Sequence, residues 1–239
     1  SDAKRRAEYD ANRYKLEGKV VGQYRVLRKI AEGGIGITYL GEHILTGMPV
    51  CLKHCTKTSA MFRDTVVNEA KAMWDLRHFS IPAVRDILEL EDSKKQRSII
   101  LVMSYIEGPT LAQIIEKTGK RLDAEHVAWI TERILNVLMY MHERAIIHGD
   151  IKPQNVIIQP KSHTVVVVDF GLAMIRPKSN SASPGYTKKF APPEQIQELP
   201  LLPASDFFSL GKTMLWALCG GDENDFNAHS VPASTPKPL

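Results

Sequence analysis

The prevailing spacing of apolar residues changes near Gly108, from mostly strand-like to mostly helical, and this change limits the fold more than any other feature. Before Gly108, short runs rich in β-branched and aromatic residues alternate with turn residues, which is typical of an antiparallel meander. The predicted strands span residues 24–30, 37–42, 48–53, 81–90 and 98–105. Helical spacing covers 62–77 and, after Gly108, also 111–118, 124–144 and 205–218. We therefore expect an α+β, bilobal fold, with a five-stranded antiparallel N-terminal lobe that carries one helix, and a mainly helical C-terminal lobe.

The same pattern divides the chain into four parts. Residues 1–20 form a charged N-terminal extension, 21–106 the N-terminal lobe and 107–220 the C-terminal lobe. Residues 221–239 are rich in proline, serine and asparagine, which predicts a disordered tail. Two short buried strands, at 157–158 and 165–168, form a hairpin inside the second lobe, and residues 172–193 form a loop.

Composition excludes several classes of function. A net charge of +4 without a dominant basic block gives no reason to expect a nucleic-acid partner. Cys51, Cys55 and Cys219 are too scattered for a disulfide framework or a zinc site, which favours a reducing, cytoplasmic location. No apolar stretch approaches the roughly 20 residues that a membrane-spanning helix needs, so we expect no membrane contact in this segment.

The chemistry is concentrated in residues 148–171, where His-Gly-Asp-Ile-Lys-Pro-Gln-Asn is followed by Asp-Phe-Gly. Phosphoryl transfer requires an orienting carboxylate, hard oxygen ligands for a metal ion, and a cation near the phosphates. Asp150 can accept or orient a substrate hydroxyl, and Lys152 can stabilise the moving phosphoryl group. Asn155 and Asp169 offer an amide oxygen and a carboxylate to a metal. Either motif alone is weak, but both at this spacing, separated by a hairpin, predict a phosphotransferase.

With these motifs, the chain from Tyr24 to Gly220 resembles a eukaryotic-like serine/threonine protein kinase of the bacterial type. The resemblance implies a bilobal fold and a glycine-rich loop over the phosphates of ATP. The matching loop residues are Ala31, which replaces the first glycine, Gly33, Gly34, Gly36 and Thr38. The resemblance also implies that Lys53 contacts the α- and β-phosphates of ATP and that Glu69 is the ion-pair partner of Lys53.

Further roles follow from the resemblance. Met103 would guard the back of the adenine pocket, Ser104 to Ile106 would form the hinge, and Cys51 and Thr38 would contribute to the pocket roof. Cys51 can also be read as a small buried hydrophobe. His148 and Phe170, with Met73, resemble a packed spine, so we expect a core role for His148. Asp206 resembles the aspartate that anchors the catalytic loop, although an N-terminal helix cap is the other interpretation.

The substrate class also follows from the resemblance. Lys152, two residues after Asp150, is the serine/threonine pattern, and Thr187 matches the threonine that bonds both Asp150 and Lys152. Residues 191–195 resemble the end of an activation segment, which implies a protein substrate. The implied cofactors are ATP and Mg²⁺, with Mn²⁺ as a substitute.

Two departures keep alternatives open. Gly149 stands where most protein kinases have an arginine that pairs with a phosphorylated loop, so we expect activity without activation-loop phosphorylation. The C-terminal lobe is short, so it is either truncated or completed by a dimer or another partner, and Glu194 is expected to lack its usual arginine. A pseudokinase or scaffold and a small-molecule kinase are the alternative functions.

Overall fold

The computed structural model describes residues 15–33, 36–57, 59–91, 95–119, 121–178, 180–222 and 226. The chain divides into two compact units. The first unit comprises residues 1–70 and 83–105, and the second comprises 71–82 and 106–239. Most of the predicted N-terminal extension and of the predicted disordered tail lies outside the described residues. None of the helices in the described ranges is both long and apolar enough to cross a bilayer.

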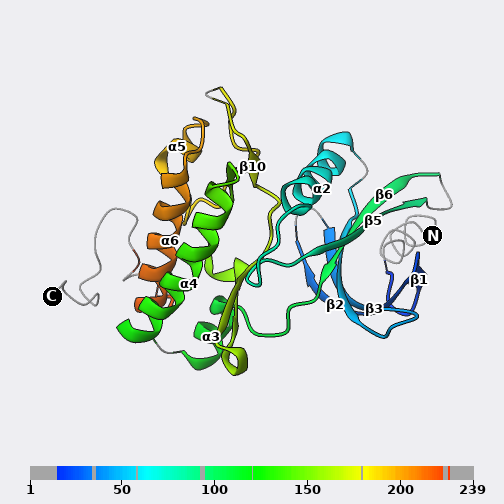
Figure 1. Cartoon of the computed structure of the whole chain (residues 1–239), viewed down its shortest axis with the longest axis horizontal. Helices are drawn as coiled ribbons and strands as arrows, with labels where there is room; N and C mark the ends of the chain where they lie inside the picture. Colours follow the sequence, from blue (N-terminus) through cyan, green and yellow to red (C-terminus); the bar gives the residue numbers. More distant parts are fainter. Residues whose placement is uncertain are drawn as a thin grey trace, which may run out of the picture. The chain divides into compact units, whose positions relative to one another are not determined.

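The first unit is built on an antiparallel sheet of six strands, in the order β1-β2-β3-β4-β6-β5 (Figure 1). The strands are β1 (Val20–Val21), β2 (Tyr24–Glu32), β3 (Gly36–His43), β4 (Pro49–Cys55), β5 (Val84–Glu91) and β6 (Arg97–Ser104). The five predicted strands are all present, but the prediction of only five was wrong, because β1 adds a sixth. Two residues are too few to give an alternation pattern. Strand β1 forms because Gly22, at a φ of +56°, lets the chain reverse and pair Val21 with Tyr24.

Within the described part of this unit, one helix, α2 (Ala60–Met73), accompanies the sheet. It ends four residues before the predicted limit of 77, although Leu76 is buried and continues the apolar spacing. Beyond the helix, the backbone N–H of Arg77 donates to the Tyr140 hydroxyl at 2.8 Å. The backbone N–H of Val167 donates to the carbonyl of Ser80 at 3.0 Å. These bonds explain why residues 71–82, predicted to belong to the N-terminal lobe, are part of the second unit.

The second unit is mainly helical, with α4 and α6 side by side (Figure 1). Its helices are α3 (Leu111–Thr118), α4 (Ala124–His142), α5 (Pro193–Ile196) and α6 (Pro203–Leu218), with 3₁₀ turns η1 (Pro153–Asn155) and η2 (Pro160–Ser162). Thr110 and Gln113 close a capping box at the start of α3, and Asp123 caps α4. Both starts therefore follow local sequence signals.

Two short strand pairs position the site loops of the second unit. Strands β8 (Val156–Gln159) and β9 (Thr164–Val167) form the predicted hairpin, and Val156 pairs with Val167. Strands β7 (Ile146–Ile147) and β10 (Met174–Ile175) form a second pair. The prediction of an unbroken loop over 172–193 was therefore wrong at its start, because β10 extends the backbone pairing just after Asp-Phe-Gly. A two-residue strand carries no periodicity that could have predicted it.

Candidate active site

Asp150, Lys152 and Thr187 form a closed triangle of hydrogen bonds in the second unit. The Lys152 ammonium donates to Oδ2 of Asp150 at 2.6 Å and to the Thr187 hydroxyl at 3.0 Å. The Thr187 hydroxyl donates to Oδ1 of Asp150 at 2.7 Å. The Asp150 and Lys152 side chains are only 7% and 18% exposed, so the charge pair is held in a partly dehydrated environment. The three residues are therefore brought together as the sequence predicted.

Asn155 completes the surroundings of this carboxylate. It lies in η1, which Pro153 begins, and its amide nitrogen donates to the carbonyl of Asp150 at 2.9 Å and to Oδ2 at 3.1 Å. Both bonds use Nδ2, so the amide oxygen remains as the group that could serve a metal ion. The two hydrogen bonds of Nδ2 thus fix the orientation of the Asn155 side chain, and its amide oxygen is the atom available to a metal ion.

Asp206 anchors the loop that carries Asp150. Its buried carboxylate accepts the backbone N–H of His148 on Oδ2 and that of Gly149 on Oδ1, each at 2.9 Å. Nε2 of His142 lies 2.8 Å from Oδ2. Helix α6 begins at Pro203 with Leu202 as its N-cap, so Asp206 is not the cap. Its contacts are those of a loop anchor, and charge-assisted bonds to two successive N–H groups fix the backbone just before Asp150.

His148 is a buried structural histidine in this arrangement. Its Nε2 lies 3.2 Å from the carbonyl of Val168, and its Nδ1 accepts the backbone N–H of Asp150 at 3.2 Å. These partners require a neutral ring protonated on Nε2. Burial lowers the pKa of His148 below its usual value, although the nearby carboxylates oppose this. The ring also packs against Phe170, with centroids 4.8 Å apart.

Asp169 follows the β8–β9 hairpin in a backbone conformation that few residues adopt. Its φ of +64° lies in the left-handed region, where aspartate is more tolerant than β-branched residues. Its side chain is exposed, unlike that of the following Phe170. A carboxylate and an amide oxygen suit a hard divalent cation that also binds phosphate oxygens. Within the described ranges, no group of three or more histidine, cysteine or acidic residues forms a metal cluster.

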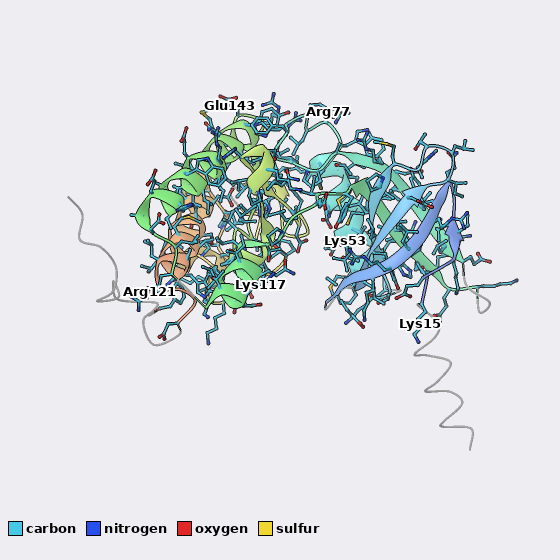
Figure 2. The ribbon with its side chains drawn as sticks, turned by 90° about the horizontal axis from the view of Figure 1, so that it is seen from below. Lys15, Lys53, Arg77, Lys117, Arg121 and Glu143 are labelled. Carbon is cyan, nitrogen blue, oxygen red and sulfur yellow. The ribbon has the colours of Figure 1, made fainter. Side chains whose placement is uncertain are left out.

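In the first unit, Lys53 of β4 and Glu69 of α2 form the expected ion pair (Figure 2 labels Lys53). The ammonium donates to both carboxylate oxygens of Glu69, at 2.7 and 3.0 Å. Glu69 is almost fully buried, with a side chain 1% exposed, whereas that of Lys53 is 19% exposed. The pair fixes the direction of the lysine, and the predicted contact of Lys53 with phosphates stays a prediction.

The predicted roof residues share one face of the sheet. Thr38 pairs with Lys53, and Cys51 pairs with Met103. Ala31 pairs with Thr38 on the other side. Directly paired residues in antiparallel strands point to the same face, so these side chains lie together. Cys51 is only partly buried by exposed surface, but its surroundings raise the pKa of its thiol to about 12, as expected of a small apolar packing residue and not of a reactive thiolate.

The glycine-rich turn between β2 and β3 is only partly described. Gly34 lies outside the described residues. The amide of Gly33 donates to the carbonyl of Gly36 at 2.9 Å. A Cβ on Gly36 would lie 1.9 Å from the carbonyl oxygen of His54, so only glycine fits against β4 at this position. The packing of the sheet therefore requires Gly36 independently of any ligand.

The predicted hinge coincides with a passage from one unit to the other. The first unit ends at Tyr105, and the chain continues into the second unit at Ile106. The Ser104 hydroxyl accepts the backbone N–H of Ala83 at 2.8 Å, and the Ser104 N–H donates to the carbonyl of Ala83 at 2.9 Å. Ser104 is thus fixed within the first unit, and the roles of Ser104 and Ile106 toward adenine stay predictions.

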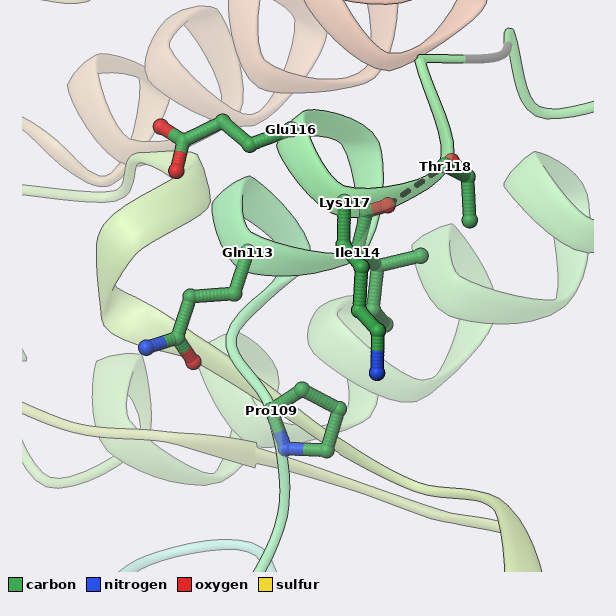
Figure 3. A pocket seen from close by; sticks show the side chains of 6 residues that line it. All are labelled: Pro109, Gln113, Ile114, Glu116, Lys117 and Thr118. Carbon is green, nitrogen blue, oxygen red and sulfur yellow. Dashed lines mark hydrogen bonds between the residues drawn. The ribbon is translucent and has the colours of Figure 1, made fainter.

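A separate open pocket lies on α3 and the residue Pro109 before it, and none of the predicted site residues lines it (Figure 3). Its lining residues come from one short stretch, and two of its polar side chains, Gln113 and Thr118, bond to the backbone of that stretch. The Gln113 side chain accepts the backbone N–H of Thr110, and the Thr118 hydroxyl donates to the carbonyl of Ile114 (Figure 3). We assign no function to this pocket.

Three further contacts at the site were not predicted from the sequence. The buried Thr213 hydroxyl of α6 donates to the carbonyl of Ile151 at 3.2 Å. The Ser205 hydroxyl donates to the carboxylate of Glu194 at 2.6 Å. Glu194 is the residue that was expected to lack its usual arginine partner. Gln195, in α5, donates to the carbonyl of Gly149 at 2.8 Å. Each contact joins distant segments, and nothing in the local sequence signals it.

The comparisons with known proteins agree with this geometry. The protein kinase domain profile matches residues 24–230. Serine/threonine-protein kinase B of Synechocystis is 29% identical over 87% of this chain and 39% of its own length. PknA of Mycobacterium tuberculosis is 30% identical over 83% of this chain and 47% of its own. A probable PknB of Lactococcus lactis is 29% identical over 85% of this chain and 32% of its own.

The chain therefore belongs to the protein kinase domain family. Its similarity to bacterial serine/threonine kinases confirms the resemblance and the bilobal fold class drawn from the motifs. The chain spans less than half the length of these curated relatives. Members of the family use ATP and a divalent metal ion.

Proposed function

We propose that this chain transfers the γ-phosphate of ATP to serine or threonine hydroxyls of a protein substrate. The triangle of Asp150, Lys152 and Thr187, closed by bonds of 2.6 to 3.0 Å, is the observation that carries the proposal. Thr187 lies 37 residues after Asp150, so the triangle links the catalytic loop to a segment that can align an extended peptide. A small-molecule kinase does not need this link.

In this mechanism Asp150 orients the substrate hydroxyl and accepts its proton. Oδ1 already accepts one hydrogen bond and Oδ2 accepts two. A carboxylate offers about four acceptor sites, so room for a substrate hydroxyl remains. Lys152 places a positive charge beside the carboxylate, where the phosphoryl group moves. The second oxygen contact of Lys152, to Thr187, fixes the direction of its ammonium.

The residues fit the cofactors that the family uses. The Asn155 amide oxygen and the Asp169 carboxylate would hold a divalent ion, for which we propose Mg²⁺ with Mn²⁺ as a substitute. When bound, ATP supplies the phosphoryl group and the metal neutralises its charge. Lys53, held by Glu69, would add a cation for the α- and β-phosphates.

We also propose that activity does not require phosphorylation of the loop between Asp169 and Glu194. Gly149 has no side chain to pair with a phosphate, and its φ is +74°. A Cβ at this position would lie 2.8 Å from the carbonyl oxygen of Leu172. Protein treated with phosphatase and shown by mass spectrometry to carry no phosphate should transfer phosphate without a lag. A lag that ends only after autophosphorylation would contradict this.

One experiment separates the candidate functions. The chain is incubated with labelled ATP and Mg²⁺, alone, with a generic basic protein, and with small alcohols, beside Asp150→Ala. We expect label on protein from the wild type and none from the variant. Label on the alcohols alone would show a small-molecule kinase, and ATP binding without turnover would show a pseudokinase. The small number of cysteines in the chain, with Cys51 and Cys55 as free thiols, supports a further proposal, a reducing cytoplasmic location.

A further inference from the structure

Gln195 lies at a junction of three segments of the second unit. This residue is buried, with only 2% of its surface exposed. Its amide nitrogen is 2.8 Å from the carbonyl oxygen of Gly149, 2.9 Å from that of Gly185 and 3.0 Å from the Ser183 hydroxyl. Two of these partners are carbonyl oxygens, which can only accept, so the group that faces them must be the NH₂. The network therefore determines the orientation of the amide.

The geometry points to Gln195 as a positioning residue that fastens the activation segment to the catalytic loop through neutral hydrogen bonds. By activation segment we mean residues 172–194. This inference rests on the proposed kinase function and names the device that holds the same site in order. Gln195 bonds to two backbone carbonyls and to Ser183 rather than to the Asp150 triangle, so its effect passes through the backbone.

The two ends of this clamp are the neighbours of the proposed catalytic groups. Gly149 directly precedes Asp150, and Gly185 comes two residues before Thr187. The Thr187–Asp150 bond joins the same two segments directly, at 2.7 Å. Two crosslinks therefore hold the segment against the loop, one through Thr187 and one through Gln195. With two crosslinks, Thr187 cannot pivot away from Asp150 by a simple rotation of the segment.

The clamp requires hydrogen-bond donors at this position. An amide nitrogen carries two hydrogens, so three acceptors within 3.0 Å share them. The Ser183 hydroxyl also donates to Gly185 at 2.7 Å, which leaves its oxygen to accept from Gln195. Without the amide, the carbonyls of Gly149 and Gly185 would lose a buried donor. Because none of these groups is charged, the clamp needs no phosphate and no arginine at position 149.

Two substitutions test this, each with a matched control two residues away. Gln195→Met keeps the length of the side chain but has no donor, and Gln195→Glu has a donor only when its carboxyl is protonated. Gln197 is exposed, so Gln197→Met and Gln197→Glu control for the change of residue type on the same short helix and turn. The readouts are kcat and KM for an unphosphorylated acceptor peptide between pH 6 and 8.5, nucleotide affinity and thermal unfolding.

We expect Gln195→Met to lower kcat about tenfold to a hundredfold, the effect of leaving a buried acceptor without its donor. Nucleotide affinity should be unchanged. Carbonyl oxygens facing the carboxyl of Gln195→Glu favour its protonated form, so its kcat relative to wild type should rise as pH falls. If Gln195 had a purely structural role, the ratio of kcat for Gln195→Glu to kcat for the wild type would not depend on pH. The Gln197 variants should match the wild type.

If the wild type and the Gln197 variants transfer phosphate and the Gln195 variants match them at every pH, the inference about Gln195 fails and the proposed function stands. If the wild type transfers no phosphate, the proposed function fails. The inference about Gln195 is then tested separately, by hydrogen exchange of the activation segment. Faster exchange of residues 181–187 in Gln195→Met, with α4 unchanged, would support the clamp. Unchanged exchange there would overturn it.

Discussion

The Thr187 hydroxyl donates a 2.7 Å hydrogen bond to Oδ1 of Asp150, 37 residues earlier in the chain. The same hydroxyl accepts from Lys152 at 3.0 Å, so one threonine contacts both charged groups of the triangle. A peptide segment and a catalytic loop are thereby joined at the carboxylate on which the proposed transfer depends. The geometry of this junction should therefore contribute to the rate, in addition to the chemistry of Asp150 itself.

Replacing Thr187 by valine should lower kcat about tenfold to a hundredfold, because the hydroxyl that aligns Asp150 and Lys152 is lost. Valine has nearly the same shape, so thermal stability should change little. Thr187→Ser, which keeps the hydroxyl, should retain most of the activity. Steady-state kinetics with a peptide substrate would measure this, and equal kcat values for valine and wild type would refute it.

Lys53→Met should destabilise the first unit by about 3 kcal/mol, because it leaves the buried Glu69 carboxylate without its cation. The matched control is Lys29→Met. Lys29 pairs with Glu32 at 2.9 Å, but both side chains are about half exposed, at 48% and 60%. That change should have little effect on stability, because solvent screens an exposed ion pair. Urea unfolding of both variants gives the comparison, and similar losses would show that the Lys53–Glu69 pair stabilises no more than a surface pair.

Gly149→Ala separates backbone strain from steric clash when it is compared with Gly47→Ala. Gly47 has a φ of +66° and open space where a Cβ would lie, so alanine there meets only the dihedral cost, about 1–2 kcal/mol. At Gly149 the φ is +74° and the Cβ would also meet Leu172, so we expect about 1–3 kcal/mol more. Equal losses of unfolding free energy would argue against the close approach of Leu172.

The stability of the chain should fall as the pH drops from 6.5 toward 4. Burial lowers the pKa of His54 to about 4, so the unfolded chain, in which histidine titrates near 6.5, takes up the proton first. The stabilisation is complete above 6.5, and about 2–3 kcal/mol of it is lost by pH 4.5. In His54→Gln this part of the pH dependence should disappear, while the contribution of His148 remains in both proteins. Identical slopes of unfolding free energy against pH would contradict the assignment.

The sequence was enough to predict the parts of the site that lie near one another in the chain or follow a strong motif. Asp150, Lys152 and Asn155 fall within six positions, and the β8–β9 hairpin that returns the chain to Asp169 has clear apolar strands. Thr187 was found through the resemblance. The Lys53–Glu69 pair was also found through the resemblance.

The rest depended on contacts that have no local signal. Gln195 meets Gly149 and Gly185 only because a short helix, a loop and the catalytic loop converge, and nothing in the residues around Gln195 predicts a buried amide. Strands β7 and β10 are two residues long and lie far apart in the chain, so tertiary pairing and not alternation makes them. The predicted end of helix α2 was too late. Leu76 continues the apolar spacing because it is buried, but the helix itself already ends at Met73.

The central claim is tested most directly by the rate of labelled phosphate transfer from ATP to a protein substrate, followed by identification of the labelled amino acids. The wild type should yield phosphoserine or phosphothreonine. Asp150→Asn, which keeps the shape of the side chain but cannot accept the proton, should be slower by at least about a hundredfold. Equal rates in the two proteins, or label absent from serine and threonine, would contradict the account.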